Sequence, residues 1–189
     1  MWYWIGSALY LLFSYLVFRV IVKNDYLKGK LTWLSISLEV LVFGIHANLP
    51  YLYFSVKWPG VPPLPDNLFQ IWMGLILTGL GILLTLSGMI YLGSTTTLGQ
   101  GSLAVRQTGF YRWTRNPQLL TYGLILIGMA TLYPSIESAV WILIYGLVAQ
   151  LMVLTEEEHL LKVFGKDYLE YCSRVPRYLS MRRSKQIQQ

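Results

Sequence analysis

The sequence predicts an all-α integral membrane protein with about five transmembrane helices. The 189-residue chain is 54% hydrophobic and only 13% charged, which is too apolar for an ordinary soluble domain. A bilayer core about 30 Å thick needs roughly 20 apolar residues in each helix that crosses it. Long runs with few or no charges therefore mark the spans, which we expect at residues 2–22, 31–55, 68–91, 117–134 and 138–155.

Each run has features that support a retained helix. The first has no charge before Arg19, and it lacks both a basic amino-terminal region and a small-residue cleavage site, so it is not typical of a signal peptide. The second carries only Glu39 and His46, and the third carries no charge. The last two runs are divided by Pro134 and Glu137, which is typical of a helical hairpin. We expect one membrane domain, with residues 156–189 as a carboxyl-terminal segment that completes the functional site.

The distribution of lysine and arginine predicts the orientation. On this division of the chain, 14 of its 15 Lys and Arg residues fall on one side and Lys57 alone on the other. Loops rich in these residues stay cytoplasmic, so we expect the amino terminus outside and the carboxyl terminus inside, in a prokaryotic inner membrane or the endoplasmic reticulum. The net charge of +6 then indicates contact with membrane lipids, with no need to invoke nucleic acid. A single cysteine, Cys172, excludes an intrachain disulfide and a Cys-based zinc site.

Glu39 and His46 form the first candidate site. Ionisable groups inside a span are costly and are usually functional. The two residues are seven positions apart, so they lie on the same side of one helix. They are either a functional pair or a buried polar pair that fixes helix packing, and the second interpretation is slightly favoured. Two ligands are too few for a metal centre, so we predict none.

The second candidate site is the start of the fourth span. Pro117 suits the first turn of a helix, and Asn116 suits the cap before it. Together with Arg115, the free backbone amides of this turn could bind an anionic group. The alternative is that Arg112 and Arg115 are membrane anchors among interfacial aromatic residues. The preceding loop, residues 93–109, is rich in Gly, Ser and Thr, which would let its backbone approach a ligand but also describes any polar loop.

The third candidate site is the carboxylate cluster that follows the fifth span. If that helix ends near Thr155, Glu156 and Glu157 oppose the helix dipole and lie about 100° apart around the axis. A cation is therefore expected beside them. Arg115 and a bound cationic ligand are both candidates for it.

Two blocks of the sequence resemble the isoprenylcysteine carboxyl methyltransferases and the related phospholipid methyltransferases. The resemblance covers roughly residues 92–180. The first block is similar to G-x-Y-R-x-x-R-H-P and stands here as Gly109, Tyr111, Arg112, Arg115, Asn116 and Pro117. The second is similar to E-E-x-x-L-x-x-x-F-G-x-x-Y-x-x-Y-x-x-x-V-P-R and stands here as Glu156, Glu157, Leu160 or Leu161, Phe164, Gly165, Tyr168, Tyr171, Val175, Pro176 and Arg177.

The resemblance implies methyl transfer from S-adenosylmethionine to a lipophilic acceptor at the membrane surface. It also implies a cytoplasm-facing cofactor pocket made by the last two spans and the carboxyl-terminal segment. The cofactor carries a sulfonium, an ammonium and a carboxylate, which suit carboxylate side chains and an Arg or helix-start amides, respectively. Carried over by position, the cofactor-binding residues would be Asn116, Pro117, Tyr122, Glu156, Gly101 and Leu103, and Arg115 and Glu157 would be catalytic residues near the acceptor.

The sequence departs from the family pattern at several positions. Asn116 replaces the usual histidine and cannot act as a base. Leu119 stands where an aromatic residue is common, and Tyr122, about one helical turn further on, is the candidate replacement. An isoprenylcysteine-type carboxylate or a related small lipid-soluble molecule is the favoured acceptor. Should the reaction need a base, Glu157 or His159 is expected to supply it.

The sequence leaves two alternative functions open. The segment at 164–179 is similar to the carboxyl-terminal segment of NADPH-dependent sterol-reductase-like enzymes, although those proteins are longer and carry further motifs not found here. A catalytically silent membrane scaffold of the same fold is favoured by Asn116. The intact carboxylates and Arg115 argue against it.

Overall fold

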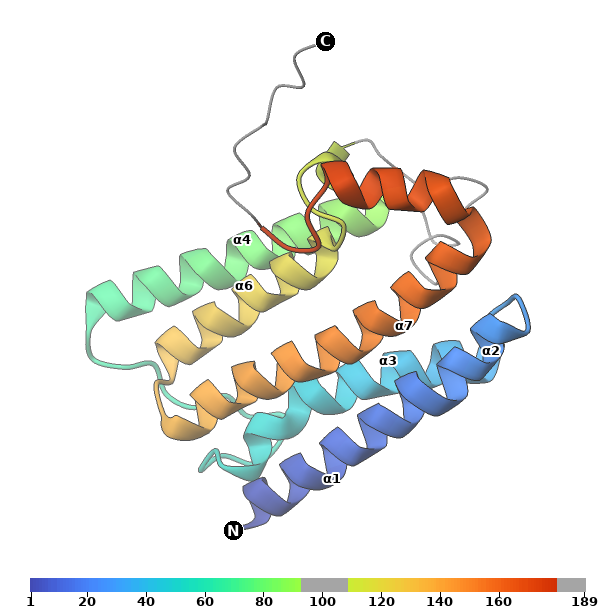
Figure 1. Cartoon of the computed structure of the whole chain (residues 1–189). Coiled ribbons are helices and arrows are strands. Elements are labelled where there is room, and N and C mark those ends of the chain that lie inside the picture. Colours follow the sequence, from blue (N-terminus) through green and yellow to red (C-terminus); the bar gives the residue numbers. More distant parts are fainter. Residues whose placement is uncertain (93–108, 180–189) are drawn as a thin grey trace.

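The computed structural model describes residues 1–92 and 109–179, and every regular element in these ranges is helical. Figure 1 shows long helices lying side by side, with the amino terminus at one end of the bundle and the end of α7 at the other. The all-α prediction is confirmed. The elements are α1 (Trp2–Leu16), the π-helical η1 (Val17–Val22), α2 (Lys23–Leu27), α3 (Trp33–Asn48), η2 (Leu49–Leu52), α4 (Leu68–Leu92), η3 (Gly109–Arg112), α6 (Pro117–Leu132) and α7 (Ile136–Arg174).

Four of these helical stretches are long and apolar enough to cross a membrane: Trp2–Leu27, Trp33–Leu52, Leu68–Ile90 and Ile136–Arg174. The first runs through α1, η1 and α2 without interruption. The expected fourth span, 117–134, corresponds to α6, which is apolar but has only 16 residues. The expected count of about five therefore agrees approximately with the structure.

Helices α4 and α6 form a closely packed antiparallel pair (Figure 1). Glycines allow the close approach: a Cβ atom added at Gly81 would lie 2.8 Å from the backbone nitrogen of Ile125. Added at Gly128, it would lie 2.6 Å from the backbone nitrogen of Thr78. Small residues at such contacts let backbones approach within a membrane, where packing and hydrogen bonds hold helices together.

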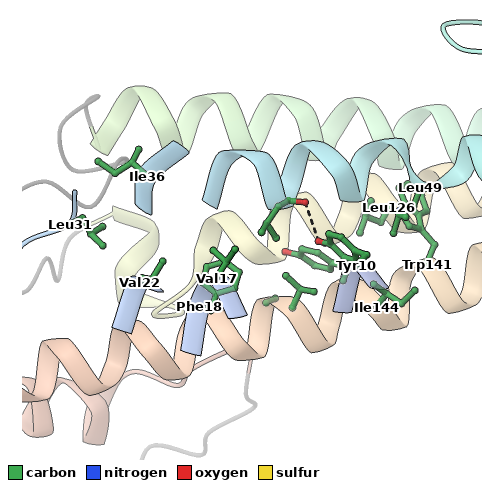
Figure 2. Packing of buried hydrophobic residues seen from close by; sticks show 14 residues of the cluster. Tyr10, Val17, Phe18, Val22, Leu31, Ile36, Leu49, Leu126, Trp141 and Ile144 are labelled. Atoms are coloured by element: carbon green, nitrogen blue, oxygen red, sulfur yellow. Dashed lines mark hydrogen bonds between the residues drawn. The ribbon is translucent and has the colours of Figure 1, made fainter. Parts of the chain in front are cut away.

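The buried core lies among the first helix, α3 and α7. Figure 2 shows Val17, Phe18 and Val22 of η1 in the same cluster as Trp141 and Ile144 of α7. The hydroxyl of Tyr10 donates a hydrogen bond of 3.1 Å to the carbonyl oxygen of Val42, which ties α1 to α3. The first and last helices of the chain are therefore neighbours.

His46 acts as a packing residue in this core. It is fully buried, its ring stacks on that of Trp141 with centroids 5.3 Å apart, and its Nε2 lies 3.1 Å from the carbonyl oxygen of Trp141. The indole of Trp141 donates in return to the carbonyl oxygen of His46, at 2.8 Å. These reciprocal contacts support the packing interpretation for His46. Glu39 takes no part in them.

Helix α7 does not end near Thr155 as expected. It continues to Arg174, with non-helical backbone angles at Gly165 (φ 49°, ψ −116°) that kink its second half across the ends of α4 and α6 (Figure 1). The carboxylates at 156–158 therefore lie inside a helix, and the argument from the helix dipole is wrong. The apolar pattern ends near Thr155, but Glu, Leu and Lys are good helix formers, so the helix continues beyond it.

Candidate functional site

Three consecutive carboxylates on α7 have three different surroundings. Successive residues of an α-helix are about 100° apart around its axis. Glu157 meets arginines from the start of α6 and from the carboxyl-terminal segment, whereas Glu158 meets cations of the first helix. Glu156 interacts electrostatically with Glu39 of α3. Glu157 and Glu158 therefore link α7 to the first helix, the start of α6 and the carboxyl-terminal segment.

Glu157 is held by two guanidinium groups. Arg115 Nη1 donates to Oε1 at 2.7 Å, and Arg177 donates from Nε to Oε1 at 3.0 Å and from Nη2 to Oε2 at 2.5 Å. The side chains of Arg115 and Glu157 are only 13% and 16% exposed, so this ion pair is shielded from water. Its hydrogen bonds to Glu157 raise the pKa of the Arg177 guanidinium. The expected pairing of Arg115 with the carboxylate cluster is therefore present.

Arg115 also contacts the second half of α7, beyond the kink. Its Nη1 lies 2.8 Å from Cys172 Sγ and 3.3 Å from the hydroxyl of Tyr168. Tyr168, Tyr171 and Cys172 belong to a small apolar cluster that packs beyond the kink. Positive φ at Gly165, which glycine adopts readily, turns this cluster back toward Arg115.

Backbone hydrogen bonds join the carboxyl-terminal segment to the start of α6. The amide of Arg115 donates to the carbonyl oxygen of Pro176 at 2.9 Å. The hydroxyl of Thr114 and the side-chain amide of Asn116 both donate to the carbonyl oxygen of Arg177, at 3.1 and 3.0 Å. These two hydrogen bonds hold the backbone of Arg177 where its side chain reaches Glu157.

Asn116 occupies the cap position of α6 and Pro117 the first turn, as expected, but the Asn116 side chain makes no capping hydrogen bond. Its NH2 group donates to the carbonyl oxygen of Arg177, and its side-chain oxygen accepts no hydrogen bond from the first-turn amides of α6. Two buried donors lie beside this turn, Arg115 Nε and Gln118 Nε2, and neither has a hydrogen-bond partner. Together they fit a ligand that offers hydrogen-bond acceptors.

Glu158 fixes the first helix against α7. It pairs with Arg19 Nη2 at 2.9 Å and with Lys23 Nζ at 2.7 Å, and its side chain is 45% exposed. One turn earlier, Arg19 Nη1 also donates to the buried hydroxyl of Thr155 at 3.3 Å. These contacts are structural, because each cation and the carboxylate are already paired.

Glu156 differs from both neighbours. Within residues 1–92 and 109–179, its carboxylate has no hydrogen-bond or ion-pair partner. The charged groups that act on it or respond to it are the carboxylates Glu157 and Glu39. A half-buried carboxylate among carboxylates needs a positive charge from elsewhere.

The remaining predicted residues fall in different places. Tyr122 faces the core, with its hydroxyl 3.4 Å from His46 Nδ1 and its ring 5.1 Å from that of Tyr145. Gly101 and Leu103 lie outside the described residues. In the part of the chain that is described, no three His, Cys, Asp or Glu side chains gather as a metal site would need. The binding and catalytic roles assigned from the sequence stay predictions.

Sequence reasoning missed the use of Arg177 and the proximity of Glu39 to Glu156. Arg177 was visible only as the last position of a motif, and nothing in the spacing predicts that it reaches back 20 residues to Glu157. For Glu39 the signal was available, because a carboxylate inside a span calls for a partner. The partner could not be named without the helix arrangement.

A known protein family matches the part of the chain that contains the carboxylates. Searches of the curated proteins and of the solved structures gave no match. The family described as phospholipid methyltransferase matches residues 69–167, which is just over half of the 189-residue chain. That range contains nearly all of α4, the whole of α6 and the three consecutive carboxylates of α7. The chain therefore belongs to the phospholipid methyltransferase family, which points to a membrane methyltransferase.

Proposed function

We propose that the protein transfers a methyl group from S-adenosylmethionine to a lipophilic acceptor at the membrane surface. One observation carries the proposal. Of the three consecutive carboxylates on α7, Glu157 and Glu158 are each paired with two cations, and Glu156 has no cationic partner among the described residues. We infer that a bound cation is the missing partner of Glu156.

The residues beside Glu156 fit the charges of this cofactor. The Glu156 carboxylate suits its sulfonium or ammonium. Arg115 Nε, Gln118 Nε2 and the uncapped first-turn amides of α6 are donors that suit its carboxylate. When bound, the cofactor supplies an activated methyl group. The contribution of the protein is then to align donor and acceptor and to exclude water.

Arg115 and Glu157 support this alignment. The prediction that they face the acceptor stays a prediction. Their ion pair, shared with Arg177, holds the start of α6 against α7 and the carboxyl-terminal segment. Both oxygens of the Glu157 carboxylate already accept hydrogen bonds from Arg115 or Arg177, so we do not assign Glu157 the role of base.

The acceptor is lipophilic, since the site lies where apolar helices leave the bilayer. The resemblance favours an isoprenylcysteine-type carboxylate, and the family description favours a phospholipid. The family match favours neither an NADPH-dependent reductase nor a silent scaffold.

Cofactor binding is the direct test. We would titrate detergent-purified protein with S-adenosylmethionine by calorimetry, and with NADPH separately. Glu156→Gln should weaken binding of the methyl donor about tenfold or more, as expected when a charged partner is lost from a shielded site. Glu170→Gln, which removes a carboxylate that is 71% exposed on the same helix, should leave binding unchanged.

Two results would count against the proposal. One is folded wild-type protein that fails to bind the methyl donor. The other is a Glu156→Gln protein that binds it as tightly as the wild type.

A further inference from the structure

The turn that joins α2 to α3 has a fixed backbone. Gly29 has a φ of 95°, and its amide donates to the carbonyl oxygen of Tyr26 at 3.1 Å. The amide of Lys30 donates to the carbonyl oxygen of Asp25 at 3.3 Å. These two hydrogen bonds are the pattern of a Schellman motif, in which the chain turns sharply at the end of a helix. The backbone positions of Lys28 and Lys30, on either side of Gly29, are therefore well defined.

Asp25 holds this turn from the inside. Its Oδ2 accepts hydrogen bonds from the amide of Thr32 at 2.9 Å and from the hydroxyl of Ser35 at 2.7 Å. The hydroxyl of Thr32 donates to the same oxygen. Asp25 is only 7% exposed, and it forms no ion pair within residues 1–92 and 109–179. The carboxylate therefore fixes the turn without forming an ion pair with its lysines.

Three lysines from two parts of the chain lie at this turn. Lys28 and Lys30 are exposed, and neither forms an ion pair in the part of the chain that the structure describes. Lys162 of α7 is also exposed, and its Nζ donates to the carbonyl oxygen of Leu27 at 3.2 Å, next to Lys28. An ammonium group has three N–H donors, so Lys162 can bind a further acceptor. The turn is therefore a positively charged surface suited to an anion.

Apolar side chains flank the lysines. Leu27 is 58% exposed, and Trp33 and Leu34 are 72% and 63% exposed. The turn connects two stretches that are long and apolar enough to cross a membrane, Trp2–Leu27 and Trp33–Leu52, so it lies at the membrane interface. Tryptophan is enriched at that interface, and lysine reaches from it toward the headgroups. A free anion would use the lysines alone, whereas a phospholipid would use the apolar side chains as well.

We propose that this turn is a binding site for an anionic phospholipid. Its phosphate contacts Lys28, Lys30 and Lys162, and its acyl chains lie along Leu27 and Trp33. The positive charge of the turn favours an anionic headgroup over a zwitterionic one. The lipid is bound and not chemically changed, and it bridges the α2–α3 turn to α7. The inference does not depend on the proposed methyl transfer.

Two lipids with the same acyl chains provide the test. We would titrate the detergent-purified full chain with dioleoylphosphatidylglycerol or dioleoylphosphatidylcholine and measure bound lipid by native mass spectrometry. Wild-type protein should bind the anionic lipid at least about tenfold more tightly. Lys28→Gln/Lys30→Gln should remove most of that preference. The matched control, Lys57→Gln/Lys166→Gln, removes the same charge from two exposed positions elsewhere and should keep the preference within about twofold.

Three results would overturn the inference. The first is wild-type protein that binds the two lipids equally, a comparison that does not depend on how any variant folds. The second is an equal loss in the two double variants, which would mean that net charge attracts the lipid and that this turn has no special part. The third is displacement of bound phosphatidylglycerol by an excess of inorganic phosphate, which would mean that the turn binds a free anion and has no use for the acyl chains.

Discussion

Glu157 is the more shielded of the two carboxylates that each pair with two cations. It joins Arg115 at the start of α6 to Arg177 in the carboxyl-terminal segment, and two of these three side chains are less than a fifth exposed. Removing one member of such a group leaves the others charged and unpaired in a shielded place. The energetic cost then comes from the groups that remain.

We therefore expect Glu157→Gln to destabilise the protein by about 3 kcal/mol, because two guanidinium groups lose their carboxylate. The measurement is the midpoint of thermal unfolding in detergent, followed by circular dichroism. Glu158→Gln is the matched control: its carboxylate also contacts two cations but is 45% exposed, so its loss should cost less than about 1 kcal/mol. Equal losses in the two variants would contradict this distinction.

At the residue scale the sequence predicted one contact of the carboxylate cluster, that with Arg115. The spacing of Glu156 and Glu157 correctly placed them on different sides of one helix, and Arg115 correctly appeared as a partner of the cluster. The sequence could not show which cation contacts each carboxylate. Lys23 and Arg177 are distant in sequence, and only the folded bundle brings them to neighbouring carboxylates.

The contact between α4 and α6 depends on glycines, which have no side chain. Gly128 faces the backbone of Thr78 and Gly74, and no side chain fits between them. Gly79 is only one residue along the same helix from Thr78, yet an added Cβ would have no neighbour within 4 Å. The two glycines therefore offer a direct comparison.

We expect Gly128→Ala to push α4 and α6 apart, because its Cβ would lie 2.6 Å from the backbone nitrogen of Thr78 and 2.8 Å from the carbonyl oxygen of Gly74. Overpacking of this kind should destabilise the protein by about 1–3 kcal/mol. Gly79→Ala should be neutral or stabilising by about 0.5–1 kcal/mol, since alanine favours a helix. Thermal unfolding of the two variants in detergent measures both effects. A Gly79→Ala protein as unstable as Gly128→Ala would contradict the assigned contact.

At the element scale the apolar pattern predicted helix positions well and helix ends poorly. The expected fourth span, 117–134, corresponds closely to Pro117–Leu132, because proline marks one end and Pro134 follows the other. For α7 the same pattern gave the end of the membrane-facing part only. The kink at Gly165 could not be predicted, since a glycine in a sequence does not reveal the sign of its φ.

For the whole molecule, the orientation in the membrane stays a prediction. We expect Lys57 outside and Lys166 in the cytoplasm. In a Cys172→Ser background, a membrane-impermeant maleimide added to intact cells should label Lys57→Cys and not Lys166→Cys. Permeabilised cells should show labelling of both. The reverse pattern in intact cells would mean that the charge distribution misassigns the two sides.

The arrangement of the helices around one another could not be predicted from the sequence. Hydrophobic runs count the spans but do not say which spans are neighbours. The packing of α1 on α7 depends on particular contacts, such as the hydrogen bond of Tyr3 to the carbonyl oxygen of Glu137. The approach of Glu39 to Glu156 follows from the same arrangement.

The hydrogen bond from Arg19 to Thr155 joins residues 136 positions apart, and this separation sets the order of events during synthesis. At roughly 5–20 residues per second, a ribosome needs about 7–27 seconds to make the 136 residues from Arg19 to Thr155. Throughout that interval the first helix waits in the bilayer with the cations of Arg19 and Lys23 unmatched by Glu158. The bundle can therefore close only when its last helix arrives, and a nascent chain that stalls before α7 exposes an unfinished first helix to quality-control proteases.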